Sequence, residues 1–229
     1  MADVSINTVT KLLVDAGTVC ASFHDERIRN VTVKRVRCDE IWSFCYSKAK
    51  NVPEHKRGSA GDLWTWTGLD ADSKLMISWT VGGRDSEYAL AFMDDLRFRL
   101  ANRVQLTTDG HRAYLEAVEG AFGADVDYEM LVKLYEESPE AEKRYSPAQC
   151  IGARKTRIVG NPDSAHVSTS YTERHNLTMR MLMRRFTQLT NAISKKVENH
   201  CHSLALYFVW HNWIRLHKAH RMTLPWRPA

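Results

Sequence analysis

Three acidic side chains stand at points of the chain where a carboxylate is costly or well placed for chemistry. Asp39 lies in an apolar run that alternates as a strand does, Asp109 follows the short apolar run 104–108, and Glu173 opens a long helical pattern. A carboxylate among apolar neighbours must be paired, bind a metal or destabilise the fold. Carboxylates on separate elements can bind divalent ions between them, and such ions promote phosphodiester cleavage. Metal-dependent chemistry on nucleic acid is therefore the first hypothesis.

Glu40 directly follows Asp39, and neighbouring residues of a strand point to opposite faces. We therefore expect only one of the two carboxylates to enter a site. Asp39 is the better candidate, since it shares its parity with the polar residues Arg37 and Ser43. Glu40 is expected to support the site from behind or to pair with a basic residue.

The other two acids each have a simpler interpretation when taken alone. Asp109 is at the carboxyl end of a strand, where mixed α/β sheets place ligands, but it is also an ordinary turn residue before Gly110. Glu173 is favoured at a helix start by the helix dipole. The dipole does not explain why Asn176 and Arg180 continue the same polar stripe, which suits a metal beside a phosphate chain.

The charge balance favours a polyanionic partner. Lys and Arg number 32 against 27 Asp and Glu, the net charge is +5, and the sequence pI is about 9.0. Basic residues are dense between positions 174 and 196. The side chains that we expect to contact DNA are Arg174, Asn176, Arg180, Arg184, Lys195 and Lys196.

The chain lacks the signals of a secreted or membrane protein. No apolar run is long enough to span a bilayer, and the first residues do not resemble a signal peptide. The five cysteines show no C-x-x-C spacing, so we expect reduced thiols in a cytoplasmic protein. Cys201 lies between two histidines, but neighbours on a helix diverge and cannot converge on one ion.

Hydrophobic periodicity predicts an α/β order of elements. A helix capped by Ser5 and stopped by Gly17 comes first, and three strands at 36–46, 63–69 and 75–81 should form an antiparallel meander. The remaining elements are a helix at 86–102 capped by Ser86, a strand at 104–108, a helix at 112–122, an ambiguous segment at 126–135, a loop at 136–148, a short strand at 157–161, and helices at 172–189 and 197–217.

Three motifs in this order resemble those of a known family. Cys38-Asp39-Glu40-Ile41-Trp42, Thr107-Thr108-Asp109-Gly110 and Glu173-Arg174-His175-Asn176 resemble the acidic motifs of DDE-type insertion-sequence transposases, and in particular the family named for the first bacterial insertion sequence. Arg180, seven residues after Glu173, matches a basic residue of that family. The segment 206–212 also looks like the closing helix of such enzymes, so the resemblance spans about 36–228.

The resemblance implies a fold and a division of the chain. Residues 35–229 would form a ribonuclease H-like catalytic domain, which is a mixed sheet of a three-strand antiparallel meander and strand–helix units, flanked by helices. Residues 1–34 would be the remnant of an N-terminal helix-turn-helix DNA-binding region with its linker.

It also implies an activity. Asp39, Asp109 and Glu173 would bind two Mg²⁺ ions, with Mn²⁺ able to substitute. The reaction would be cleavage at element ends and attack of a 3′-hydroxyl on target DNA. The partners would be terminal inverted repeats, target DNA and at least one further copy of the chain, in the cytoplasm at the nucleoid.

Two other functions fit the same residues. A transposase-derived protein could bind DNA through the basic residues without cutting it. A nuclease of the same fold could hydrolyse DNA without strand transfer. His175 is not expected to bind a metal, because it points away from Glu173 on the helix.

Overall fold

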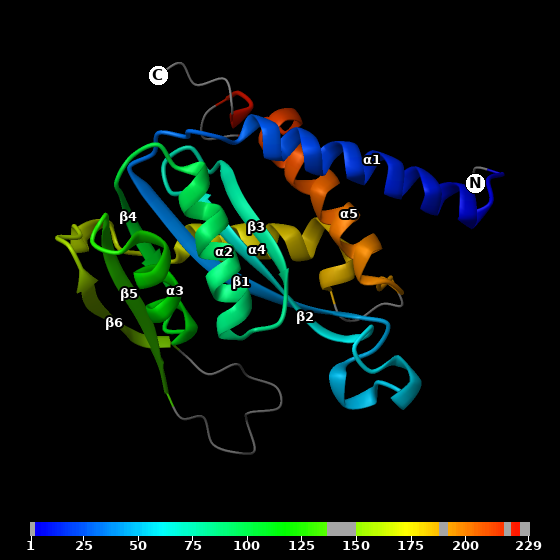
Figure 1. Cartoon of the computed structure of the whole chain (residues 1–229), viewed down its shortest axis with the longest axis horizontal. Helices are drawn as coiled ribbons and strands as arrows, with labels where there is room; N and C mark the ends of the chain where they lie inside the picture. The colour runs from blue at the N-terminus through cyan, green and yellow to red at the C-terminus, as the bar shows by residue number, and fades with distance from the viewer. Residues whose placement is uncertain (1–2, 137–149, 188–191, 218–220, 225–229) are drawn as a thin grey trace.

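The computed structural model of the chain describes residues 3–136, 150–187, 192–217 and 221–224 (Figure 1). These residues form a mixed α/β fold. Its helices and strands are α1 (Ile6–Arg27), β1 (Arg35–Cys45), β2 (Gly61–Asp70), β3 (Met76–Gly82), α2 (Ser86–Arg99), β4 (Val104–Thr108), α3 (Ala113–Phe122), β5 (Val126–Tyr135), β6 (Cys150–Val159), α4 (Ser170–Leu182) and α5 (Val197–Val209), which continues as a π-helical turn (Trp210–Ile214).

The described strands make one six-stranded sheet in the order β3-β2-β1-β4-β5-β6. Strands β1, β2 and β3 form the antiparallel meander, β4 joins β1 in parallel, β5 joins β4 in parallel, and β6 closes the edge in antiparallel. The predicted α/β class is therefore confirmed: a mixed sheet of a three-strand antiparallel meander followed by strand–helix units, flanked by helices.

The sheet is covered on both faces, which explains the composition of its central strand. On one face α2 and α3 pack through residues such as Phe92 and Tyr114, and on the other α4 and α5 pack through Met179 and Phe208. Strand β1 carries Cys38 to the first layer and Ile41 to the second, both with no exposed surface. A carboxylate on such a strand can reach water only where the sheet opens.

The N-terminal helix is longer than predicted. Ser5 caps α1 as expected, but the helix continues through Gly17 to Arg27, so the predicted stop at Gly17 is wrong. Gly17 lies where α1 meets α5, and a Cβ on it would lie only 2.4 Å from the Cβ of His202. The glycine therefore serves close packing of two helices. The proposed domain division at residue 34 stays a prediction.

Other boundaries differ for local reasons. Asp85, rather than Ser86, caps α2 by accepting a hydrogen bond from the Tyr88 N–H. The ambiguous segment at 126–135 is strand β5, and its partner β6 has ten residues instead of the short strand expected. Helix α4 begins at Ser170 and ends at Leu182, short of the predicted end at 189, because Met183 is extended. Positions 137–148 of the predicted loop and 188–189 of the predicted helix lie outside the described residues.

The five cysteines are all described and all free. Within the described part of the chain, no helix is long and apolar enough to cross a membrane.

Candidate active site

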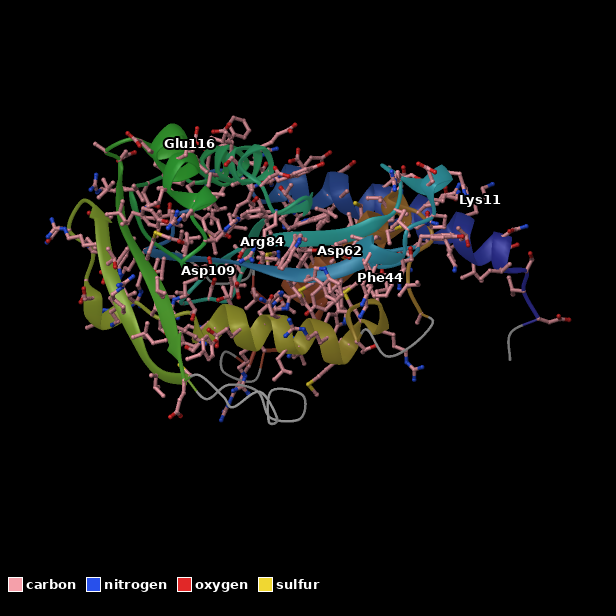
Figure 2. All side chains as sticks on the ribbon, turned by 90° about the horizontal axis from the view of Figure 1, so that it is seen from below. Lys11, Phe44, Asp62, Arg84, Asp109 and Glu116 are labelled. Atoms are coloured by element: carbon pink, nitrogen blue, oxygen red, sulfur yellow. The ribbon has the colours of Figure 1, made fainter. Side chains whose placement is uncertain are left out.

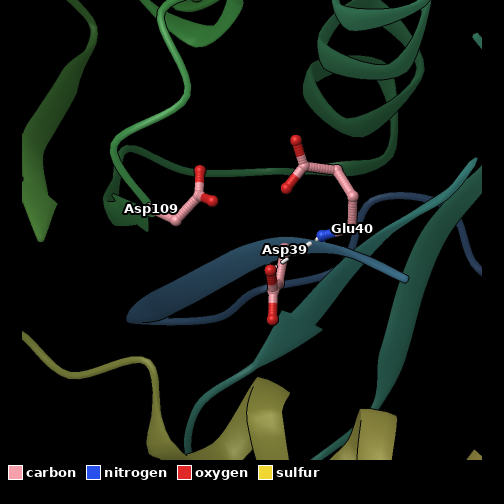
Figure 3. Close-up of side chains that lie close together, drawn as sticks. All are labelled: Asp39, Glu40 and Asp109. Carbon is pink, nitrogen blue, oxygen red and sulfur yellow. Dashed lines mark hydrogen bonds between the residues drawn. The ribbon is translucent and has the colours of Figure 1, made fainter. Parts of the chain in front are cut away.

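A cleft of about 920 Å³ opens beside the middle of β1 and the carboxyl end of β4 and is bounded by β5 and α4. Three acidic side chains meet there: Asp39, Glu40 and Asp109 each offer an oxygen, and these oxygens lie within 4.8 Å of one another (Figure 3). Figure 2 shows Asp109 and Arg84 above α4, which crosses beneath the sheet. The structure thus brings together two of the three acids predicted to bind metal, and adds Glu40.

Both neighbours reach the site because the sheet splits at this point. Strand β1 pairs with β4 only from Arg35 to Arg37, and β4 itself ends at Thr108. Beyond Arg37, no strand in the described part of the chain pairs with the β4 side of β1. Asp39 and Glu40 leave opposite faces of the strand: Glu40 lies on the same side as Asp109, and the Asp39 carboxylate points toward α4 (Figure 3). One oxygen of each still lies within 4.8 Å of the others. The expectation that only one of them enters the site is therefore wrong.

Asp39 is fixed between its own strand and α4. One carboxylate oxygen accepts a hydrogen bond from the Glu40 N–H at 2.9 Å, and the other accepts one from the Asn176 side-chain amide, also at 2.9 Å. Burial, reinforced by the negative charge of Asp109, raises the pKa of Asp39 to about 7. The carboxylate is therefore held in place while its charge is poorly compensated.

Glu40 is buried more deeply than Asp39, and the pKa of its carboxyl group is also raised. Its side chain is only 1% exposed, and burial together with Asp109 raises its pKa to about 8. Arg84 lies 3.4 Å away and offsets part of this shift, so the predicted pairing of Glu40 with a basic residue is confirmed. The His111 ring nitrogen is 3.9 Å from the same oxygen.

Asp109 and Arg84 form the rim of the cleft on the β4 side. Asp109 accepts a hydrogen bond from the His111 N–H at 2.9 Å, which is the turn role that the sequence also allowed. Its other oxygen is 3.7 Å from the Arg84 guanidinium, which also lies over the Trp64 ring at 4.6 Å. Arg84 follows Gly82-Gly83 at the end of β3 and therefore bridges two of the three clustered acids.

Glu173 lies on the opposite wall of the cleft, on the first turn of α4. It is outside the 4.8 Å group, among the described residues, and pairs with Lys133 and Thr169. Burial alone would raise its pKa, but the hydrogen bonds from Lys133 and Thr169 outweigh burial, and the pKa of Glu173 is lowered. Its negative charge still contributes to the raised pKa of Asp39.

The predicted DNA contacts do not share one surface. Asn176 and Arg180 line the cleft, as their helical spacing from Glu173 predicts. Arg174 lines a different pocket on the other side of α4, and Arg184 lines a third depression. Lys195 lies 5.3 Å from the Tyr46 ring, and exposed Lys196 precedes α5.

Three cleft residues escaped the sequence interpretation: Glu40 as part of the cluster, Arg84, and Lys133. The alternation in β5 gives a weak signal for Lys133, a charge in a run of apolar residues. Arg84 reaches the site only because β3 ends near it, which no local pattern reveals.

The donor set fits a hard divalent cation. The ligands are carboxylate oxygens, which Mg²⁺ and Mn²⁺ prefer. The Asn176 side-chain oxygen is also buried without a hydrogen-bond partner, next to Asp39. Burial first, and the charge of Asp109 second, raise the pKa values of Asp39 and Glu40, and a bound cation would lower them by favouring the ionised carboxylates.

Comparison with known proteins gives fold-level likeness only. No family model and no curated protein matches the chain. A chain of the simian T-cell lymphotropic virus intasome, solved in complex with a PP2A regulatory subunit, has a TM-score of 0.48 and 15% identity, over 87% of this chain and 56% of that one. The present chain thus spans little more than half of that relative.

Two further solved structures are similar. The HTLV-2 integrase catalytic core domain in complex with magnesium (trimeric form) has a TM-score of 0.47 and 11% identity, over 85% of this chain and 95% of that one. Endonuclease V from Bacillus subtilis has a TM-score of 0.27 and 15% identity, over 83% and 91%. Likeness at this level does not show what the present chain does.

Proposed function

We propose that this protein is a DDE-type transposase that cleaves DNA at element ends and joins the 3′-hydroxyl to target DNA in a Mg²⁺-dependent reaction. The observation that carries the proposal is the convergence of Asp39, Glu40 and Asp109 in a cleft whose opposite wall holds Glu173. Such a set on separate elements suits two-ion phosphodiester chemistry.

Each side chain has a distinct role in this proposal. Asp39, Asp109 and Glu173 are the catalytic, metal-binding acids, and Asn176 fixes the orientation of Asp39. Glu40 adds negative charge behind them once a bound cation favours its ionised form. A bound pair of Mg²⁺ ions, or Mn²⁺ in their place, would supply a Lewis acid at the attacking and leaving oxygens. Glu173 now forms an ion pair with Lys133. It could bind a metal ion only after this ion pair breaks.

The cations around the cleft favour a polyanionic substrate. Arg84, Arg112, Lys133 and Arg180 all line it, so a phosphate backbone would meet positive charge on both sides of the carboxylates. Arg174, Arg184, Lys195 and Lys196 would extend DNA contact beyond the cleft. We further propose terminal inverted repeats and target DNA as partners and at least a dimer on DNA. Residues 1–34 would contribute to end binding, and the protein would work at the nucleoid.

The deciding experiment offers the protein a labelled duplex with a pre-cut 3′-hydroxyl end and randomised terminal sequence, together with supercoiled plasmid and Mn²⁺. Label joined to plasmid supports a transposase. Nicked plasmid without joined label identifies a nuclease of the same fold. Duplex binding with neither product identifies a DNA-binding protein without activity, and sinks the proposal.

The variant Asp109→Asn tests whether cleavage and joining depend on the acids of the cleft. It should remove both products and retain duplex binding, whereas Glu116→Gln, an exposed change on α3, should retain all of them. Products that persist in Asp109→Asn would show that the acids are assigned wrongly.

A further inference from the structure

A second pocket, of about 600 Å³, lies on the side of α4 away from the carboxylates, between that helix, the β2–β3 turn and the segment after α5. Three cations line it: Lys74 from the turn, Arg174 from α4 and Arg215 after the π-helical turn. No carboxylate is among the described residues that line it. The charged side chains of the pocket lining are therefore all positive, whereas the cleft is lined by charges of both signs.

Lys74 is placed in the pocket at a conformational cost. Its backbone φ is +72°, a left-handed conformation that glycine and asparagine adopt far more readily than lysine. Its ammonium group lies 3.1 Å from the centroid of the Tyr171 ring and donates to the Ala71 carbonyl. Burial, assisted by the charge of Arg37, lowers the pKa of Lys74 to about 8. Positive charge is thus crowded at this wall.

The nearby acids of the turn are already engaged. Asp72 pairs with Arg35, and Asp70 accepts hydrogen bonds from the backbone and side chain of Ser73. They lessen the charge around Lys74 without lining the pocket.

Two buried histidines on the pocket wall have unused polar atoms. The Nε2 of His175 and the Nδ1 of His211 are buried with no hydrogen-bond partner, although both side chains line the pocket. Burial lowers the pKa of His175 well below its usual range and that of His211 to about 3, so both rings are neutral. The His175 Nε2 can donate to an anion or accept from its hydroxyl. The His211 Nδ1 can only accept from a hydroxyl, because the proton of this neutral ring is on the Nε2 that donates to the Lys74 carbonyl.

The other ring nitrogen of His211 is anchored. Its Nε2 is 3.1 Å from the Lys74 carbonyl oxygen, so a hydrogen bond connects the segment that carries His211 to the turn that carries Lys74. Asn212 reinforces this tie with two hydrogen bonds of 3.0 Å to the backbone of Met76. The pocket is therefore lined by a connected framework and not by independent surface side chains.

We propose that this pocket binds a phosphate group, carried either by a DNA backbone or by a small phosphorylated molecule. Two guanidinium groups and an ammonium group can donate to several oxygens of one anion, which suits phosphate better than a carboxylate with two oxygens. The inference does not depend on the activity proposed for the cleft, because α4 separates the two sites.

The test is calorimetric titration of inorganic phosphate into metal-free protein, so that the carboxylate cleft takes no part. We expect saturable binding by the wild-type chain and a loss of about tenfold or more in Arg174→Gln and in Arg215→Gln. Arg57→Gln removes the same charge from an exposed loop and should bind as the wild type does. No saturation by the wild type, or an equal loss in Arg57→Gln, would overturn the proposal.

Competition with a short DNA duplex, again without metal, identifies the source of the phosphate. If the ligand is a DNA backbone, inorganic phosphate displaces the duplex, and the pocket variants bind it more weakly than Arg57→Gln does. If the ligand is a small phosphorylated molecule, the pocket variants lose phosphate binding and keep the duplex affinity of Arg57→Gln. Thermal unfolding checks that each variant is folded.

Discussion

The two sides of α4 face surfaces that differ in charge. On one side Glu173, Asn176 and Arg180 face a cleft in which three clustered carboxylates lie among cations. On the other side Arg174 and His175 face a pocket lined by cations and by no described acid. Helical periodicity alone separates them, since residues one or two positions apart leave the helix in different directions. One helix can therefore serve a cation site and an anion site, provided that each wall supplies the complementary charge.

Asp109→Asn should have the largest effect on the cleft side. Any metal-dependent DNA cleavage should fall by at least about a thousandfold, because an amide cannot supply the charge that holds the cation. The side chain is 33% exposed, so the change should leave the melting temperature nearly intact. Cleavage and thermal unfolding are measured together, and a large drop in melting temperature would mean that activity is lost through unfolding instead.

The stability of the metal-free protein should fall as the pH rises. Folded Asp39 and Glu40 keep their protons to about pH 7 and pH 8, whereas the unfolded chain releases them near pH 4. The folded state thus binds more protons between these values, and stability declines across the window by a few kcal/mol. Urea unfolding at about pH 5.5 and about pH 8.5 measures this decline.

Two controls assign that pH dependence to the cleft. The double variant Asp39→Asn with Glu40→Gln should flatten the decline, because neither side chain then titrates. Mg²⁺ should restore stability more at the higher pH than at the lower. An unchanged decline in the double variant would place the titrating groups elsewhere.

Arg84→Gln should strengthen divalent-cation binding by several-fold. The guanidinium is 3.4 Å from Glu40 and 3.7 Å from Asp109. It therefore competes with a metal cation for the negative charge of these two carboxylates. The gain is modest because Arg84 is 39% exposed and its interactions are screened by solvent. Titration with Mn²⁺ followed by electron paramagnetic resonance gives the affinity. Weaker binding in the variant would show that Arg84 orders the acids instead of competing for them.

Arg174→Gln should have the smallest effect on the cleft. Its side chain leaves α4 toward the phosphate pocket, so Mn²⁺ affinity should change by less than about twofold. Arg180→Gln is the matched change on the cleft side and should alter Mn²⁺ affinity more. Equal effects from the two arginines would remove the distinction between the two sides of the helix.

Local pattern was sufficient for strands β1 to β4 and for the position of two clustered acids. Asp39 in an apolar strand and Asp109 after another are visible in the sequence, and the register of β1 and β4 brings them together. The 3.6-residue period also placed Asn176 on the cleft side of α4.

What the sequence missed depends on contacts between distant segments. Glu40 joins the cluster because β1 and β4 separate after three paired residues, and a pleat rule applied to one strand cannot detect a split between two. Gly17 resembled a helix stop because its packing partner, His202, is far along the chain. The phosphate pocket combines α4 with a turn and the segment after α5, so no continuous motif encodes it.

Helix α1 also has a mechanical consequence. Its 22 residues span about 33 Å, and it is fastened near Gly17 by α5 and near His24, whose ring bonds the Met76 carbonyl. Its first turns carry exposed apolar side chains, among them Ile6 and Leu12. This end is therefore a rigid arm and not a tether. A molecule bound to this end would have a fixed orientation relative to the sheet. Inserting one residue before Gly17 would rotate the bound molecule about the helix axis by about 100°.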